Sequence, residues 1–340
     1  MTTRVLPALA ILGCFVAAVV TTIAVLSASH PAYQVDWRVH VAGALGFLDH
    51  SLYRHPLELD GLHMSAEEFK LPPLAAVWAI PLAGLDPFTG GIVWATLGMV
   101  ALGIASWFMA VALGATPAWI WAGIGMGVYA FHPLFFKTAV QGNINQLMLL
   151  LVAWFVVAHL RGQQRTAGVL LGLAIATKLW PLPLAVVAIR ERRWLELRWA
   201  AGVLGVQAIA MLAWLGTDAI GPMIQIARFD IDPETYPLLW ISALQRVEWW
   251  PSWGGIAIAL GLMAIPARGR VGMGLAIVAG LSLVINLWPE YAPTLAFGFA
   301  LIAVELMRNL RQRSVARLRP VPDPSSPVSS PPGPDPRAAG

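Results

Sequence analysis

Residues 33–74 read YQVDWRVHVAGALGFLDHSLYRHPLELDGLHMSAEEFKLPPL and form the first substantially polar stretch of a very apolar chain. This stretch follows one hydrophobic run, at about residues 6–27, and precedes another that opens at Leu71. A polar loop between two such runs is typical of a connection at a membrane surface. Asp36 comes shortly after the first run, so its carboxylate is expected near the lipid headgroups, where a charge is costly unless it is hydrated, paired or used.

The composition indicates a multi-span membrane protein. The chain has 340 residues, of which 58% are hydrophobic and 12% are charged, and its mean hydropathy is +0.69. Open sheets cannot cross lipid, and the apolar runs do not alternate as barrel strands do. The net charge of +4 comes mainly from arginines in short loops and the tail. Topology explains these arginines better than nucleic-acid binding does.

The apolar runs predict an all-α polytopic fold of about 10–11 transmembrane or re-entrant helices. Several runs are shorter than the roughly 20 residues of a full crossing. Short, Pro-broken helices are tolerated where they line a cavity, which indicates an internal chamber. The candidate segments are residues 6–27, 72–85, 90–113, 117–131, 144–160, 166–179, 181–190, 199–216, 253–266, 271–287 and 292–307.

Arginine clusters predict the orientation, because basic residues concentrate in cytoplasmic loops. The clusters placed in the cytoplasm are Arg161 and Arg165; Arg190, Arg192, Arg193 and Arg198; Arg268 and Arg270; and Arg308, Arg311, Arg313, Arg317 and Arg319. The outward loops are then residues 28–71, 178–181, 217–252 and 286–291.

The predicted topology is inconsistent between Asp86 and Arg161. A turn near Asp86 is also placed in the cytoplasm, so the crossings from there to Arg161 must be even, yet three apolar segments lie between them. Either residues 117–140 are re-entrant or one boundary is misplaced. We favour a break at His132-Pro133, which puts Gln141 to Asn143 on the outer side.

The sequence is expected to form one catalytic membrane domain followed by a tail. Residues 1–310 are expected to form the membrane domain, and the Pro- and Ser-rich residues 311–340 a disordered cytoplasmic tail. The first apolar run resembles a signal peptide in part, but its length favours a retained span. Cys14 is the only cysteine, which excludes a disulfide framework and a thiolate metal site.

Asp36 and Lys178 are the first candidates for chemistry. Asp36 opens a predicted surface helix (residues 37–48), where it can act as a helix cap, as a general base, or as both. Lys178 ends an apolar helix just before Pro181, so it either extends to the interface or binds an anion.

Other polar groups lie in the outward loops and before the span at 144–160. Residues 141–146 (QGNINQ) can cap that span or hydrogen-bond to a sugar or phosphate, and His132 and Lys137 lie just upstream. Residues 217–253 mix aromatic and charged side chains, which suits either sugar stacking or an interfacial aromatic belt. Glu290 lies in a further outward turn. The histidines of the first loop show no metal-ligand spacing.

Several motifs, in this order, are similar to those of one enzyme family. They are Asp36 after the first span, Gly46 and Leu52-Tyr53, Leu71-Pro72-Pro73-Leu74, Gln141-Gly142-Asn143-Ile144-Asn145, Ala167-Gly168 with Leu171-Gly172-Leu173-Ala174, Thr177-Lys178-Leu179-Trp180-Pro181, and Arg192-Arg193-Trp194. From about residue 30 to 200 the chain resembles glycosyltransferase family 87. It departs at His40, where an aromatic residue is expected, and at residues 288–291, which replace a His-containing motif.

The resemblance implies a GT-C-like membrane enzyme with interfacial helices in its first outer loop. Such an enzyme moves mannose or arabinofuranose from a polyprenyl-phosphate donor to a glycolipid or cell-wall glycan outside the plasma membrane. Asp36 is then the base of an inverting displacement that needs no metal or other cofactor. The alternatives are a lipid-linked-sugar flippase or transporter, and a non-catalytic assembly partner. Candidate phosphate-binding residues are Lys178, Lys137, His132 and Arg228; candidate sugar- or acceptor-binding residues are Gln141, Asn143, Asn145, Trp180, Tyr53, Glu290 and Tyr291.

Overall fold

The computed structural model describes residues 2–27, 35–52, 57–59, 62–64, 69, 71–131, 142–221, 255–283 and 291–318. These ranges are helical apart from one short hairpin, which confirms the all-α expectation. The elements are α1 (Thr2–Ser27), α2 (Val35–Leu48), β1 (Leu57–Leu59), β2 (Leu62–Met64), α3 (Pro73–Val77), η2 (Ile80–Leu82), α4 (Pro87–Leu113), α5 (Ala118–Ala130), α7 (Asn145–Leu160), α8 (Gln164–Thr177), α9 (Pro183–Arg190), α10 (Trp194–Leu215), η3 (Thr217–Ala219), α13 (Gly255–Ala264), α14 (Gly269–Ser282) and α15 (Ala292–Leu318).

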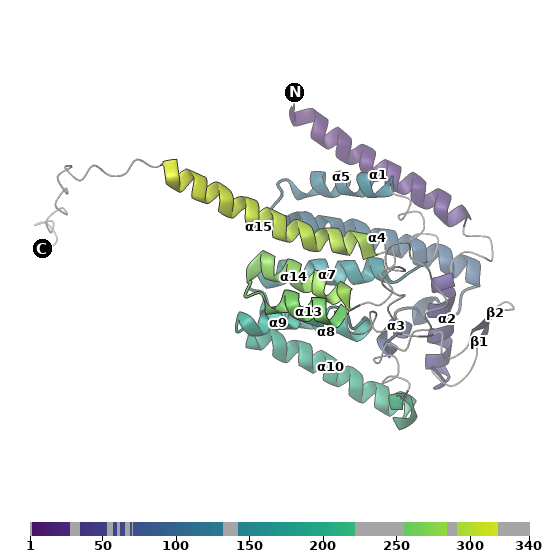
Figure 1. The fold of residues 1–340 in the computed structure, drawn as a ribbon. Helices are drawn as coiled ribbons and strands as arrows, with labels where there is room; N and C mark the ends of the chain where they lie inside the picture. Colours follow the sequence, from purple (N-terminus) through teal and green to yellow (C-terminus); the bar gives the residue numbers. More distant parts are fainter. Residues whose placement is uncertain are drawn as a thin grey trace, which may run out of the picture.

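The long helices form a layered bundle (Figure 1). Helix α1 packs on α5, α5 on α4, α4 on α7, α7 on α8, and α8 on α10, while α14 packs between α15 and α9. Helix α7 therefore lies in the middle of the stack, and most of its side chains are buried. Helices α1 and α10 form opposite edges of the bundle in Figure 1.

The outer helix faces are apolar, as expected for contact with lipid. Phe15 on α1 is 64% exposed, and Val206 and Ile209 on α10 are 70% and 71% exposed. Four helices in the described ranges are long and apolar enough to cross a membrane: Val5–Ile23, Phe88–Leu113, Trp194–Leu215 and Pro293–Ser314. Further apolar helices are shorter, and two of them, α7 and α14, bury most of their side chains inside the bundle. The chain is thus a polytopic membrane protein.

Glycines allow the helices to approach one another closely. Gly13 of α1 contacts the backbone of Gly123 and Gly127 on α5, and Gly168 of α8 contacts the backbone of Glu196 on α10. Small residues at such crossings replace the hydrophobic driving force that helices lack in lipid, because they allow backbone-to-backbone van der Waals contact.

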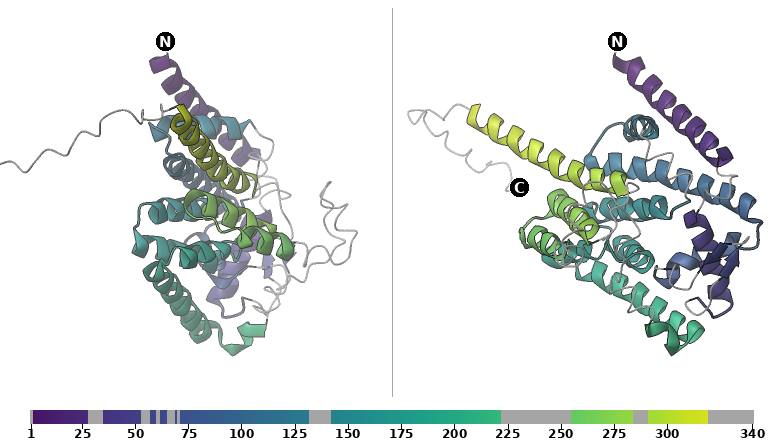
Figure 2. Two further views of the ribbon diagram at one scale, coloured as in Figure 1. Left: turned by 60° about the vertical axis from the view of Figure 1, so that its left-hand side comes forward. Right: turned by 45° about the vertical axis from the view of Figure 1, so that its right-hand side comes forward.

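The two ends of the bundle differ in chemistry. Helices α2 and α3 lie at one end, and the second half of α15 projects from the other (Figures 1 and 2). Arg270 of α14 donates to the carbonyl of Ala112 at the end of α4, with 2.6 Å between the two atoms. Helix α15 continues with Arg308, Arg311 and Arg313 at that same end. Residues 319–340, most of the expected tail, lie outside the described residues.

The expectation that the turn near Asp86 lies on the opposite side of the membrane from the loop that contains Asp36 is wrong. Asp86 caps α4 by accepting from the Thr89 N–H at 3.0 Å, and Gly90 in the next turn contacts the ring of Trp37 from α2. This turn therefore lies at the same end as Asp36. Residues 72–85 form α3 and η2, which stay at that end, so three crossings from Asp86 to Arg161 are what the alternation requires.

Candidate active site

Trp37 packs the first turn of α2 against the loop that leads into α7. The Trp37 side chain is 1% exposed and lies between Gly90 of α4 and Gly142. Gly142 has φ +70°, and a methyl group there would lie 2.7 Å from the Trp37 Cβ. Trp94 contacts both Gly142 and Trp37. Its Nε1 donates to the Gly142 carbonyl at 2.6 Å, and its ring centroid lies 5.3 Å from that of Trp37. This packing brings the residue before Trp37 next to the residue after Gly142.

A chain of hydrogen bonds connects Asp36 to Lys178 through two asparagines. Asn143 Nδ2 donates to Asp36 Oδ2 at 2.7 Å. The Asn145 backbone N–H donates to Asn143 Oδ1 at 3.0 Å. Lys178 Nζ donates to Asn145 Oδ1 at 2.7 Å and to the Tyr291 hydroxyl at 3.2 Å. The Asp36 carboxylate and the Lys178 ammonium group thus belong to one network but do not contact each other directly in the described part of the structure.

Helix ends supply most of this network. Asn145 is the first residue of α7 and Tyr291 directly precedes α15. Lys178 follows α8 with an extended backbone (φ −147°, ψ 141°), which ends the helix. Trp78 Nε1 donates to the Thr177 hydroxyl at 3.0 Å, so the end of α8 is tied to the segment after α3. Five segments far apart in sequence therefore meet at the α2 end of the bundle.

Burial makes Lys178 a candidate anion-binding group. Lys178 is 8% exposed, and its hydrogen-bond partners Asn145 and Tyr291 are 4% and 6% exposed. Within the described ranges, Lys178 forms an ion pair with no carboxylate. A buried ammonium group bound only to neutral oxygens is costly. The site therefore favours a ligand that carries a negative charge.

His40 lies beside this network, and the sequence reasoning did not include it among the candidate site residues. It is 2% exposed, and its ring centroid lies 5.5 Å from that of Trp94. Burial, and secondly the charge of Lys178, lower the pKa of His40 to about 3, so the imidazole is neutral at physiological pH. The signal was its spacing: residues four apart on a helix lie on one face, and His40 comes four residues after Asp36.

Trp180 is buried but is not part of the hydrogen-bonded chain. Its side chain is 4% exposed, and its backbone and ring contact Gly280 of α14. The Trp180 Nε1 has no hydrogen-bond partner among the described residues, and the same holds for the Gln146 Oε1 on α7. Both polar atoms lie on elements that border the network.

The remaining predicted site residues lie outside the described residues. Asp36, Asn143, Asn145, Lys178 and Tyr291 are brought together, whereas the positions of six others are not described. These six are Tyr53, His132, Lys137, Gln141, Arg228 and Glu290.

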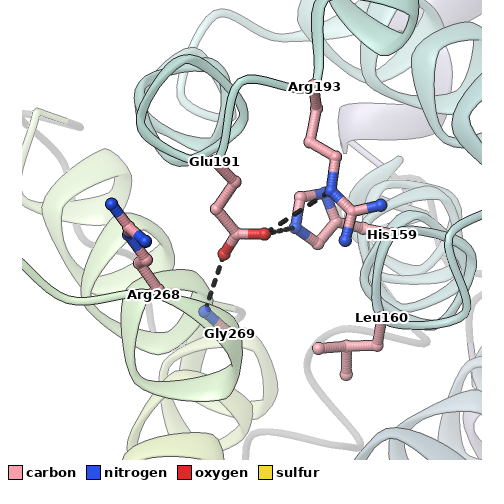
Figure 3. A pocket seen from close by; sticks show the side chains of 6 residues that line it. All are labelled: His159, Leu160, Glu191, Arg193, Arg268 and Gly269. Atoms are coloured by element: carbon pink, nitrogen blue, oxygen red, sulfur yellow. Dashed lines mark hydrogen bonds and ion pairs between the residues drawn. The ribbon is translucent and has the colours of Figure 1, made fainter.

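A second polar cluster lies at the opposite end of α7 (Figure 3). His159, 1% exposed, contacts Glu196 of α10 at 3.0 Å and Glu191 at 3.1 Å. Glu191 also accepts from the Gly269 N–H of α14 at 2.7 Å and lies 3.6 Å from Arg193. Burial raises the pKa of Glu191, but the Gly269 N–H, His159 and Arg193 together hold it below its usual range.

This second cluster ties helices together. His159, Glu191 and Arg193 border a cavity of about 440 Å³, but the Glu191 carboxylate oxygens face the His159 ring, Arg193 and the Gly269 N–H (Figure 3). The cluster joins α7, α10 and α14 at the arginine-rich end. Across the described ranges, no group of three or more His, Cys, Asp or Glu side chains is arranged to bind a metal.

The hydrogen-bonded network at the α2 end of the bundle, here the α2-end network, consists of Asp36, Asn143, Asn145, Lys178 and Tyr291. Most of it lies within a segment that matches a known family. Residues 69–308 match the model of glycosyltransferase family 87. The match covers Asn143, Asn145, Lys178 and Tyr291 and begins downstream of Asp36. No curated protein and no solved structure matches the chain. Because the match extends over more than half of the sequence, the chain belongs to glycosyltransferase family 87.

Proposed function

We propose that this membrane glycosyltransferase takes its sugar from a polyprenyl-phosphate donor and transfers it to a glycolipid or cell-wall glycan. Mannose is the favoured sugar and arabinofuranose the next. The reaction takes place on the extracytoplasmic face of the plasma membrane, because the network lies at the end opposite the arginine-rich loops. No nucleic acid takes part.

The observation that carries the proposal is the connection of Asp36 to a buried Lys178 through Asn143 and Asn145. Glycosyl transfer from a lipid phosphate needs two charges: a base for the acceptor hydroxyl and a cation for the leaving phosphate. Both must lie within one substrate length of each other. A single short network that ends in a carboxylate and an ammonium group meets this requirement.

The reaction is a single displacement at the anomeric carbon. The acceptor oxygen forms a bond to that carbon while the bond from the carbon to the phosphate oxygen breaks. The hydroxyl proton passes to Asp36, and the electron pair of the broken bond stays on the phosphate, next to Lys178. One displacement inverts the anomeric centre, so one carboxylate suffices where a hydrolase uses two.

The asparagines keep the two charges apart. Asn143 accepts from the Asn145 N–H, which directs its Nδ2 to Asp36. Asn145 and Tyr291 hold Lys178 through neutral oxygens. A direct ion pair between Asp36 and Lys178 would lower the reactivity of both groups, and the two asparagines separate them.

The test uses purified protein, each polyprenyl-phosphate sugar in turn, and a panel of glycolipid acceptors. Asp36→Asn is expected to abolish transfer without loss of folded protein. Asp49→Asn is the matched control, since Asp49 is exposed just beyond the end of α2. Unchanged transfer by Asp36→Asn rules out Asp36 as the base. No transfer by wild-type protein from either donor rejects the proposed function, and a flippase or assembly role then stands.

A further inference from the structure

His40 has a buried polar atom that nothing in the described fold uses. Its Nδ1 is shielded from solvent and has no hydrogen-bond partner among the described residues. A buried nitrogen without a partner costs free energy that a core aromatic residue would not. Such an atom in a folded protein calls for an explanation, and a ligand that binds there is one.

The location of His40 connects it to the proposed reaction. It lies one helical turn after Asp36 on α2 and packs on Trp94, whose Nε1 fixes the carbonyl of Gly142. Lys178 is close enough to act on it electrostatically. His40 therefore lies close to the carboxylate end of the network through α2, and within electrostatic range of its ammonium end.

We propose that His40 binds the transferred sugar, with Nδ1 as the hydrogen-bond partner of a sugar hydroxyl. This inference rests on the proposed function and names a specificity-determining residue for it. A neutral imidazole nitrogen suits a hydroxyl group, which both donates and accepts. Phosphate oxygens are bound more strongly by cationic donors, and Lys178 already supplies one.

Three variants test which nitrogen of the His40 ring binds the sugar. His40→Phe keeps an aromatic ring and removes both nitrogens. His40→Asn places an amide near the position of Nδ1, and His40→Gln places one near Nε2. We expect His40→Phe and His40→Gln to lower kcat/KM for the sugar donor by roughly 10-fold. His40→Asn should retain more activity than either.

Stability distinguishes this role from a structural one. If His40 only supported the core, His40→Phe would lower both Tm and activity. Because the variant removes an unpartnered buried polar atom, we expect its Tm to be equal to or above that of the wild type while kcat/KM falls. Arg38→Gln, a change on the same helix at a half-exposed residue, serves as the control and should alter neither.

A binding measurement distinguishes sugar from phosphate and does not depend on turnover. Thermal stabilisation by the polyprenyl-phosphate sugar is compared with that by polyprenyl phosphate, which lacks the sugar. His40→Phe should weaken binding of the first by roughly 10-fold and leave the second unchanged. Equal weakening of both would assign His40 to the phosphate, and no weakening of either would remove it from the site; both results overturn the inference. Wild-type protein that binds the donor without transferring sugar would reject the proposed function alone.

Discussion

Asn143→Ala removes a side chain that donates to Asp36 Oδ2 and accepts from the Asn145 N–H at the start of α7. We expect this variant to lower kcat, because the Asp36 carboxylate loses a donor that fixes its direction. A hydrogen bond to a charged group contributes about 1.5–3 kcal/mol. Asn143 and Asp36 are both half-buried, so the lower part of this range applies. About 1.5–2 kcal/mol in the transition state corresponds to a roughly 10- to 30-fold loss of kcat.

The second hydrogen bond of Asn143 predicts a separate effect on stability. Without Asn143 Oδ1, the Asn145 N–H at the start of α7 loses its acceptor. Loss of a side-chain acceptor at a helix start costs about 0.5–2 kcal/mol. The Tm of the purified protein in detergent should therefore fall by a few degrees, while the protein remains folded and binds donor.

Asn143→Asp separates the two effects. An aspartate still offers an oxygen to the Asn145 N–H, so the start of α7 should persist. Its second oxygen would face the Asp36 carboxylate, and two carboxylates in contact retain a proton more readily than one. The acid limb of the pH–rate profile should then move to higher pH, with activity recovering in alkaline buffer.

The assay is steady-state transfer from the polyprenyl-phosphate sugar across a range of pH, with kcat and KM measured separately. An Asn143→Ala variant with wild-type kcat would refute the reasoning, because Asp36 would then not depend on Asn143. So would an Asn143→Asp variant whose pH–rate profile is unchanged.

Outcomes are expected for four further variants. Gly142→Ala should lower Tm and kcat, because a left-handed φ costs about 1–2 kcal/mol for other residues and the new methyl group meets Trp37; Gly103→Ala, which meets nothing within 4 Å, should change neither. Lys178→Met should lower kcat by about 100- to 1000-fold, and Tyr291→Phe, which removes one hydroxyl, by about 10-fold or less; donor kinetics measure both. Because the pKa of Glu191 is lower in the folded state, its stabilisation is present at neutral pH and is lost as pH falls through that pKa, so Tm should fall on acidification in the wild type and less so in Glu191→Gln.

Much of the α2-end network could be predicted because its members lie at breaks in the apolar pattern. Asp36 follows the first run, and Asn143 and Asn145 precede the span at 144–160. Lys178 ends one apolar helix before Pro181. A polar residue at such a break must face water, a partner or a ligand, so position along the chain narrows the candidates. Tyr291 belongs to the predicted outward turn at residues 286–291, and the family resemblance added the order of the motifs.

The side on which Asp86 lies could not be read from the sequence in this way. Residues 72–85 are as apolar as a short crossing helix and contain Pro72, Pro73 and Pro81. Proline occurs in membrane spans as well as in surface segments. The contact of Trp37 with Gly90 places Asp86 at the same end of the bundle as Asp36. That contact joins residues more than fifty positions apart, and no local pattern encodes it.

His159 and its two glutamates were missed for a related reason. His159 lies in an apolar helix, and its partners Glu191 and Glu196 come more than thirty residues later. In the sequence, both glutamates stand among arginines and suggest only a solvated loop. The fold places them against the end of α7, where one buried imidazole joins three helices.

The direction of the helices adds to the charge pattern at the proposed site. Helix α7 begins at Asn145, so its N-terminal end, which carries partial positive charge, points toward the network. Lys178 follows the last turn of α8, whose C-terminal end carries partial negative charge and stabilises a cation. A lipid phosphate bound at Lys178 would therefore meet the full charge of the ammonium group and the partial positive charge of the α7 N-terminus, while the partial negative charge of the α8 C-terminus is offset by Lys178 itself. The N-terminal end of α7 thus favours an anion at the proposed position of the leaving group, and the C-terminal end of α8 stabilises the cation that would bind it.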